Sequence, residues 1–302
     1  MITSKLVEIF CLADEFCKEF YKTIAGSQIS RNSGKKSRNK PCKLNDAEVI
    51  TIMIAFHLVG YRNLKNFYIN YVQKHLQDYF PETVSYNRFV ELQQKALLPM
   101  TIFLKTMCLG QSTGISFVDS TPVRVCKNKR IFNHKVFKDI AQRGKSTMGY
   151  FFGFKLHIVV NDKGEIIEFV ITPGNVDDRQ PLKDSNFLKK VAGKLFADKG
   201  YVSQKLFENL FIDGIHLITG IRSNMKNQIM SMYDKIMLRK RSIIETINDE
   251  LKNICQIEHS RHRSFANFLT NMISGLLAYS FLPKKPSIKY QTNPSSSQLA
   301  LF

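Results

Sequence analysis

The spacing of hydrophobic residues changes from a helical to a strand-like pattern near Gly114. Before that point, apolar side chains recur every three to four positions, which is typical of helices packed on one side. Asn45 and Glu48 have the spacing of a helix capping box, and Gly60 ends the pattern that follows them. We therefore predict a helical amino-terminal domain over residues 1–110. Its expected helices span residues 1–25, 49–59, 63–79 and 86–107.

Short apolar runs replace the helical pattern after Gly114. Residues 151–160 and 165–172 flank an Asn-Asp-Lys-Gly segment, whose composition suits the tight turn of an antiparallel hairpin. Further apolar runs end at Asp119, at Asp198 and near residue 221, with helical stretches near 180–191 and 204–210. These runs predict an α/β domain over residues 111–282 with a mixed five-stranded sheet and flanking helices. The remaining tail, 283–302, is rich in Pro, Ser and Lys and is predicted to be disordered.

A periodic stretch around Glu245 predicts a helix with one polar stripe. At 3.6 residues per turn, Arg241, Glu245, Asn248 and Lys252 fall within about 60° of one another. Apolar residues occupy a different arc, so the helix can pack on a sheet and still present acidic and basic groups at its edge. The alternative is an ordinary surface face with an ion pair between Arg241 and Glu245.

Three carboxylates are the candidate catalytic residues. Asp119 and Asp198 each close an apolar run, and on neighbouring parallel strands they would lie roughly 5 Å apart. Glu245 would join them from its helix. Such acids can bind two cations about 3.5 to 4 Å apart, an arrangement that supports phosphodiester chemistry. Hard oxygen ligands favour Mg²⁺ or Mn²⁺, and the six cysteines include no C-x-x-C pair that would favour a zinc site.

The charge of the chain favours a polyanionic partner. Forty-four Lys and Arg against 25 Asp and Glu give a formal net charge of +19. Nucleic acid is the leading partner. A membrane surface ranks lower because the basic residues do not flank an apolar anchor, and residues 265–282 are interrupted by polar side chains. The first residues lack the pattern of a secretion signal, so we expect a cytoplasmic, nucleoid-associated protein.

Several basic segments are candidates for contacting DNA. Residues 26–43 lack acids and predict a basic arm, although a merely solvated loop is the alternative. Arg88 lies in the segment 85–89, which could begin a recognition helix, but any helix pair joined by a short turn satisfies that pattern. Between Lys127 and Lys155, eight Lys or Arg accompany a single acid, which predicts a loop along the DNA backbone or a solvated loop. The candidate phosphate contacts in the arm are Arg31, Lys35, Lys36, Arg38 and Lys40.

With these motifs in place, residues 114–282 resemble a bacterial insertion-sequence transposase of the DDE type, most similar to the 982 family of insertion sequences. The resemblance rests on the segments 117–121, 149–157, 173–179, 197–201, 241–252 and 258–264. It implies a ribonuclease-H-like fold in which Asp119, Asp198 and Glu245 bind the metals. Arg241, Glu245 and Lys252 keep the spacing of the family's Y-(2)-R-(3)-E-(6)-K signature, whereas Leu238 replaces the tyrosine. The 46 residues between Asp198 and Glu245 leave no room for a large insertion domain.

The resemblance further implies how the protein acts. It would bind the terminal inverted repeats of its element as a homo-oligomer, cleave the DNA with two divalent metals and join the 3′-hydroxyl ends to target DNA. An inactive DNA-binding remnant or repressor, and a nuclease without strand transfer, are the alternatives.

Other residues near these motifs complete the candidate set. Arg241, Lys252 and Lys199 are expected to contact phosphates, although Arg241 and Lys252 could instead neutralise nearby acids. Four residues are weaker candidates for accessory roles, because strand histidines and Asn or Asp in turns often serve local structure. These are His157, Asp178, Asn248 and His262.

Overall fold

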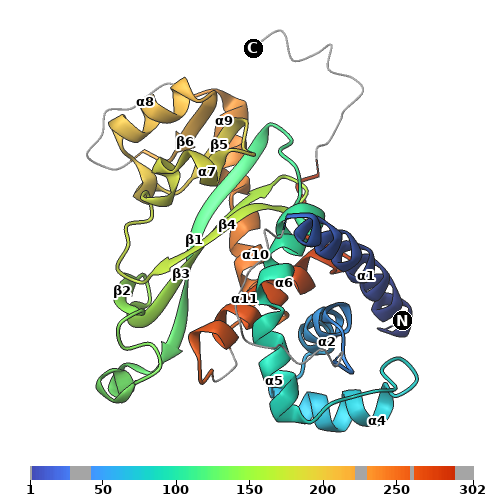
Figure 1. The fold of residues 1–302 in the computed structure, drawn as a ribbon. Helices are drawn as coiled ribbons and strands as arrows, with labels where there is room; N and C mark the ends of the chain where they lie inside the picture. Colours follow the sequence, from blue (N-terminus) through green and yellow to red (C-terminus); the bar gives the residue numbers. More distant parts are fainter. Residues whose placement is uncertain (1, 28–41, 222–229, 259–261, 290–302) are drawn as a thin grey trace.

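The computed structural model describes residues 2–27, 42–221, 230–258 and 262–289, and within these ranges a six-stranded mixed sheet lies beside a group of helices (Figure 1). The strands are β1 (Ile115–Cys126), β2 (Gln142–Ser146), β3 (Gly149–Asn161), β4 (Ile166–Pro173), β5 (Gly193–Ala197) and β6 (Ile215–Thr219). β1, β5 and β6 are parallel, β3 is antiparallel to β1, and both β2 and β4 pair with β3. The order β4-β3-β1-β5-β6 is the ribonuclease-H-like arrangement that the sequence predicts, with β2 as an addition.

Helices precede the sheet and cover it. The amino-terminal group contains α1 (Ile2–Ser27), α2 (Asp46–Val59), α3 (Leu64–Asn66), the π-helix η1 (Phe67–Val72), α4 (Gln73–His75), α5 (Tyr86–Lys95), α6 (Leu97–Phe103) and the π-helix η2 (Leu104–Cys108). The later helices are the 3₁₀ turns η3 (Asn128–Asn133), η4 (Pro181–Lys183) and η5 (Lys199–Tyr201), with α7 (Ser185–Leu188), α8 (Gln204–Ile212), α9 (Met232–Lys240), α10 (Ser242–Asn253) and α11 (Phe265–Ser280).

The predicted caps of α2 are confirmed, and the helix begins at Asp46, three residues before the expected stretch 49–59. The Asn45 side chain accepts a hydrogen bond from the Glu48 amide, and the Glu48 carboxylate accepts one from the Asn45 amide. Gly60 ends the helix in the left-handed conformation, with φ of 78°.

Three predicted helices are shorter or divided. The stretch 63–79 is helical only as far as His75. The stretch 86–107 is interrupted at Ala96, because Pro99 has no N–H to donate to the Lys95 carbonyl four residues earlier. The helix expected near 180–191 is reduced to η4 and the four residues of α7.

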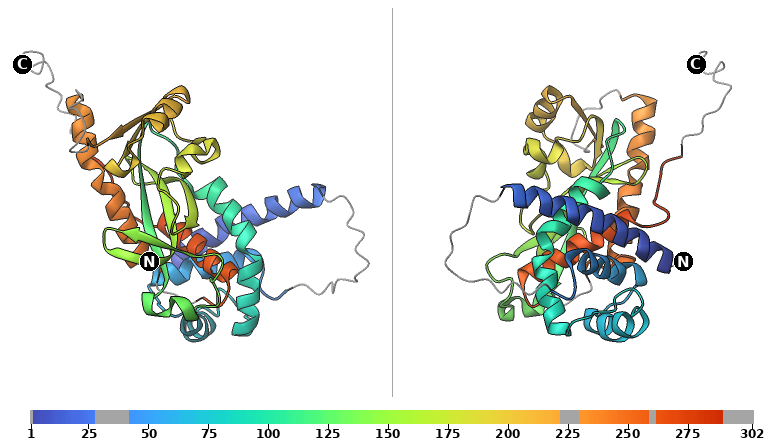
Figure 2. Two further views of the ribbon diagram at one scale, coloured as in Figure 1. Left: turned by 90° about the vertical axis from the view of Figure 1, so that its left-hand side faces the viewer. Right: turned by 45° about the vertical axis from the view of Figure 1, so that its right-hand side comes forward.

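The two faces of the sheet carry separate hydrophobic clusters. Figure 2 shows α9 and α10 on one face and α7 and α8 on the other. Phe117 and Phe196 stack with ring centroids 5.5 Å apart and belong to the cluster that contains Ile244 and Ile247 of α10. Val118, which lies between Phe117 and Asp119 in β1, belongs to the cluster on the opposite face, with residues of α7 and α8. Since side chains alternate along a strand, Asp119 shares the face of Phe117 and lies toward α10.

Helix α11 connects the sheet with the amino-terminal helices. It contacts α2, α5, α6 and α10, and its residues from Thr270 to Tyr279 are all buried. The polar residues that interrupt this stretch bond to neighbouring elements: Asn271 donates to the Ile257 carbonyl, and Ser274 contacts His57 at 2.9 Å. Within the described residues, one hydrophobic cluster therefore runs from α1 through α11 to the sheet. The predicted boundary at residue 110 separates two types of secondary structure within a shared core.

Phe154 of β3 joins the sheet to α11 and provides a test of that shared core. Its buried ring lies 4.9 Å from Phe268 and 5.7 Å from Phe265. We expect Phe154→Ala to lower the free energy of unfolding by about 3 to 5 kcal/mol, because it leaves a cavity among these rings. Chemical denaturation should show one shifted transition. Phe211→Ala, at a 63% exposed position of α8, serves as the control and should change stability little. Separate transitions for sheet and helices would contradict the shared core.

The first part of the predicted tail contacts the sheet. Ile288 donates its amide to the Asp162 carbonyl at 2.8 Å, and Lys285 donates to the Ser280 carbonyl at 2.8 Å. A side chain at Gly164 would collide with the Pro286 carbonyl oxygen, so the chain passes closely over the β3–β4 turn. Residues 283–289 therefore lie close to the β3–β4 turn, and the rest of the predicted disordered tail lies outside the described residues.

No helix within the described ranges is long and apolar enough to cross a bilayer.

Candidate active site

Asp119 and Asp198 are level with each other on adjacent parallel strands. The ladder between β1 and β5 ends with Phe117 opposite Phe196, and Asp119 and Asp198 each lie two residues further on. Asp198 follows the end of β5, as the sequence predicts. Asp119 does not end its strand, because β1 continues to Cys126 along β3. The sequence prediction that a strand ends at Asp119 is therefore wrong, because β1 continues beyond this residue. The pairing of β1 with its parallel neighbour β5, however, does stop just before Asp119.

The Asp119 carboxylate is held between the sheet and α10. Its Oδ2 accepts a hydrogen bond from Nδ2 of Asn248 at 3.3 Å. Burial raises the pKa of Asp119 from 3.8 to about 6, which the charge of Arg241 and the Ser120 amide oppose. The charges of Glu245 and Asp198 raise this pKa further, which places the three acids in one electrostatic neighbourhood.

Arg241 links the other two acids. Its Nη2 lies 2.8 Å from Oε1 of Glu245 and 3.9 Å from Oδ1 of Asp198. Both carboxylates are more than half exposed, whereas the Arg241 side chain is only 18% exposed. The predicted polar stripe on α10 therefore faces the two aspartates. The alternative ion pair between Arg241 and Glu245 is present as well, within the same group of residues.

In this structure the three carboxylates are not close enough to one another to bind a shared metal ion. Among the residues that the structure describes, no group of three or more His, Cys, Asp or Glu side chains has the spacing to hold a metal ion. The positive charge between Asp198 and Glu245 is instead the Arg241 guanidinium. The donor set fits Mg²⁺ or Mn²⁺ in its chemistry, since it consists of carboxylate oxygens with an amide beside them. Reorientation of Glu245 away from Arg241 is required for all three acids to share ions.

The remaining basic candidates lie on several different elements. Lys199 directly follows Asp198, and its aliphatic chain lies beside Gly220. Lys252 lies 3.8 Å from Glu258, an acid that the sequence analysis did not consider as its partner. Arg88 is on α5 and pairs with Glu91, within the amino-terminal helices. The arm residues Arg31, Lys35, Lys36, Arg38 and Lys40 lie outside the described residues.

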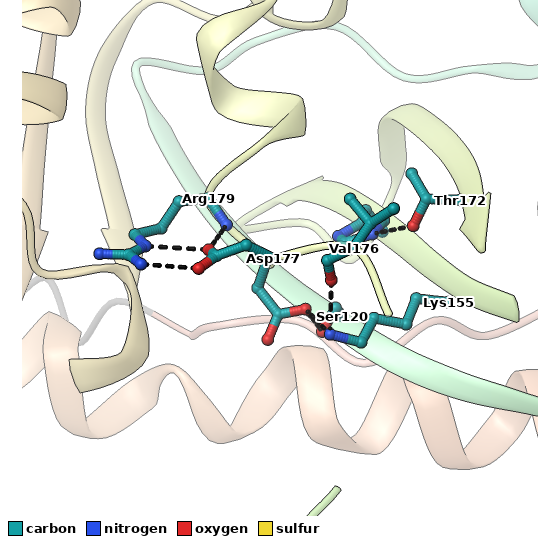
Figure 3. A network of polar contacts seen from close by, with 8 residues as sticks. Ser120, Lys155, Thr172, Val176, Asp177 and Arg179 are labelled. Carbon is teal, nitrogen blue, oxygen red and sulfur yellow. Dashed lines mark hydrogen bonds and ion pairs between the residues drawn. The ribbon is translucent and has the colours of Figure 1, made fainter. Parts of the chain in front are cut away.

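Asp178 belongs to a polar network that touches Ser120, the residue after Asp119. Figure 3 labels Ser120 and Lys155 in this network. Oδ1 of Asp178 accepts hydrogen bonds from the Ser120 hydroxyl and the Lys155 ammonium group, both at 2.8 Å. Lys155 also donates to the Val176 carbonyl at 2.8 Å. His157, opposite Ser120 in the β1–β3 ladder, contacts the Thr172 hydroxyl at 2.9 Å, and burial lowers its pKa to about 4. The network reaches the segment of Asp119 only through Ser120, whose side chain lies on the opposite face of β1 from that of Asp119.

His262 lies apart from this group. Its ring packs against Phe268 and lines a small cavity together with Val123 and Glu258. Val123 is four residues beyond Asp119 on β1, which is about 13 Å at 3.3 Å per residue. Burial lowers the pKa of His262 to about 4, so the neutral ring fits its apolar contact. The structure therefore does not bring His262 together with the three acids.

Three residues of the site were not selected from the sequence. Tyr201 is buried, and the charges of Asp119 and Asp178 add to the burial that raises the pKa of its phenol. Ser120 and Lys155 join the site through Asp178. Ser120 and Tyr201 lie in the sequence motifs around Asp119 and Asp198, and these motifs could have identified them as site residues. Lys155 also stands in a quoted motif, residues 149–157, but its ion pair with Asp178 depends on the pairing of β3 with its neighbours.

One family model matches the sequence. The model of the family described as "Transposase DDE domain" matches residues 109–265, just over half of the chain. The matched residues contain all three acids and Arg241. No curated protein matches the sequence.

Two solved structures are similar at low identity. A piggyBac transposase synaptic complex with hairpin DNA is 10% identical, with 92% of this chain and 72% of that chain covered and a TM-score of 0.45. The Mos1 strand transfer complex is 11% identical, with 87% and 83% covered and a TM-score of 0.23.

Proposed function

This chain belongs to the transposase DDE domain family, and from that premise we propose that it is an enzyme that cleaves DNA at the ends of a mobile element and joins the freed 3′-hydroxyl groups to target DNA. One observation carries the proposal: Asp119, Asp198 and Glu245 gather around the Arg241 guanidinium. Within the family, the segments quoted above favour the insertion-sequence 982 group. We further propose that it acts as a homo-oligomer on the terminal inverted repeats, in the cytoplasm.

The three acids are the proposed catalytic residues and would hold two Mg²⁺ or Mn²⁺ ions. When bound, such ions activate a water or hydroxyl for attack and stabilise the leaving oxygen. Asn248 would keep Asp119 oriented through the hydrogen bond to Oδ2. Arg241 would release Glu245 and turn to a phosphate of the DNA, because its planar guanidinium can donate two parallel hydrogen bonds to phosphate oxygens.

The test is a strand-transfer assay with labelled duplexes that carry the ends of the element, a supercoiled plasmid as target and Mg²⁺. A transposase should produce labelled ends joined covalently to the plasmid. A nuclease without strand transfer would release cleaved ends and join none of them. A non-catalytic repressor would shift the duplex in a gel and leave it uncut, which would overturn the proposal.

Lys252 is proposed to bind a phosphate near the scissile bond. It lies about two turns beyond Glu245 on α10, and its side chain is 23% exposed. We expect Lys252→Ala to weaken binding to all DNA sequences and to reduce the slope of log affinity against log salt by about 1. Metal binding should be retained, and Lys205→Ala on α8 serves as the control. An unchanged slope would mean that Lys252 serves only the ion pair with Glu258.

A further inference from the structure

An open cavity of about 750 Å³ lies beside the β2–β3 hairpin, and its lining includes none of the three acids. Its lining comes from η3, from β2 and β3, and from the segment after β4. Gly200, two residues after Asp198, forms part of its wall. Asp178, which accepts the hydrogen bond from Ser120 beside Asp119, forms another part. Through Gly200 and Asp178 the cavity is therefore connected to the segments that carry Asp198 and Asp119, and its volume is in the range of sites for small ligands.

Two glycines shape the wall of this cavity. A Cβ atom at Gly144 of β2 would lie 2.2 Å from the Gly174 carbonyl oxygen, and one at Gly174 would lie 2.7 Å from the Gln142 carbonyl oxygen. Any larger residue at either position would force β2 and the segment after β4 apart. The close approach of these two backbones holds the β2–β3 hairpin against the segment that carries Asp178.

The mouth of the cavity presents cations next to exposed aromatic rings. Lys145 lies over the Tyr150 ring, 5.9 Å from its centroid, and Arg143 lies over the nearby Phe132 ring at 5.4 Å. Tyr150 is 67% exposed and Phe132 is 89% exposed. Positive groups interleaved with exposed rings are the surface on which unpaired nucleotides bind, because phosphates pair with the cations and bases stack on the rings.

The inner wall of the cavity has a different chemistry. Lys155 and Asp178 form an ion pair there, with the Lys155 side chain only 12% exposed and the Asp178 side chain 39% exposed. A carboxylate repels phosphate but accepts hydrogen bonds from the amino and imino groups of a base. The change from cations and rings at the mouth to a carboxylate inside therefore matches a nucleotide that enters base first.

We propose that this cavity binds one unpaired nucleotide of the DNA strand next to the cleavage point, with its base stacked on Tyr150 and its edge toward Asp178. The proposal rests on the proposed transposase function and specifies where that DNA lies. A base within a duplex cannot enter a concave site without leaving its stack, so the nucleotide must be flipped out or part of a single-stranded extension. Arg143 and Lys145 bind the phosphates on either side of it.

The experiment compares two fluorescent 20-base-pair duplexes, one blunt and one with a three-nucleotide extension that carries 2-aminopurine at its first unpaired position. Both 3′ and 5′ extensions are measured, with Ca²⁺ present, by anisotropy for affinity and by 2-aminopurine emission for stacking. We expect one extension to bind wild-type protein on the order of tenfold more tightly than the blunt duplex, with quenched emission. Tyr150→Ala should abolish the gain and the quenching, whereas Tyr150→Phe should keep both.

The control is Tyr79→Ala, which removes another exposed tyrosine, in the helical region, and should retain the gain. Because Tyr150 is mostly exposed, its truncation should leave the melting temperature unchanged, which rules out misfolding as the cause. Equal affinity for blunt and extended duplexes, or a gain that survives Tyr150→Ala, would overturn the cavity as the site. If the same protein still cuts and joins DNA, the proposed transposase function is retained and only the proposed nucleotide site is rejected. Failure to bind either duplex would overturn both.

Discussion

Asp119→Asn, Asp198→Asn and Glu245→Gln should each reduce DNA cleavage by about three orders of magnitude or more. Each change removes a charged metal ligand with little change in volume, and metal ions contribute several kcal/mol to stabilising the transition state of phosphoryl transfer. The fold and the binding of DNA ends should be retained, since Asp198 and Glu245 are more than half exposed. The measurement is single-turnover cleavage of labelled end DNA alongside a gel-shift assay.

Asp249→Asn is the matched control for these three variants. Asp249 is an exposed acid on the same helix as Glu245, with its carboxylate bonded to Asn253 one turn further on. Its variant should cleave at the wild-type rate. If one of the three acid variants cleaves normally, that acid does not belong to the catalytic group, whereas loss of cleavage by Asp249→Asn would mean that the assay reports general damage.

Removal of divalent metal should abolish cleavage, and Mg²⁺ or Mn²⁺ should restore it. We expect Ca²⁺ to support DNA binding far better than turnover, because its larger and looser oxygen shell misplaces the attacking group. Chelator-treated protein is assayed with each ion added back. Full cleavage in the presence of chelator would contradict the proposed metal mechanism. The control is DNA binding by the chelated protein, which should persist through the basic surface.

The affinity for metal should also depend on pH through Asp119. Burial raises the pKa of this carboxyl to about 6, and only the ionised form binds a cation. Above pH 6 the affinity should therefore be nearly constant, and below pH 6 it should fall by about tenfold per unit as a proton competes for the site. Calorimetric titration with Mn²⁺ between pH 5 and 8 measures this dependence. A flat profile would mean that Asp119 does not bind the ion.

Much of the candidate site could be predicted because its residues stand in local patterns. Asp198 closes a short apolar run, and Arg241, Glu245 and Asn248 share one face of a strongly periodic helix. The structure brings all of them together with Asp119. The capping box of α2 was equally local, so both of its caps were predicted correctly.

The features that escaped prediction depend on pairing between distant segments. β2 carries Arg143, Gly144 and Lys145, a composition that suits a loop, and it forms a strand only because β3 offers it a partner. β1 passes through Pro122, which would ordinarily disfavour a strand, but β5 has already ended at that point and leaves that edge without a neighbour. The ion pair between Lys155 and Asp178 likewise requires the register of the sheet.

The buried position of α11 determines when the amino-terminal helices can complete their folding. His57 of α2 contacts Ser274 across 217 positions of sequence, and α11 fills the space between α2, α5 and α6. A growing chain therefore cannot finish the core of its first hundred residues until α11, at residues 265–280, has been synthesised. Contacts between residues so far apart in sequence form slowly, and the amino-terminal helices expose apolar surface until α11 packs against them. A copy of the gene interrupted after α10 would lose the support of its amino-terminal helices together with the end of its catalytic domain.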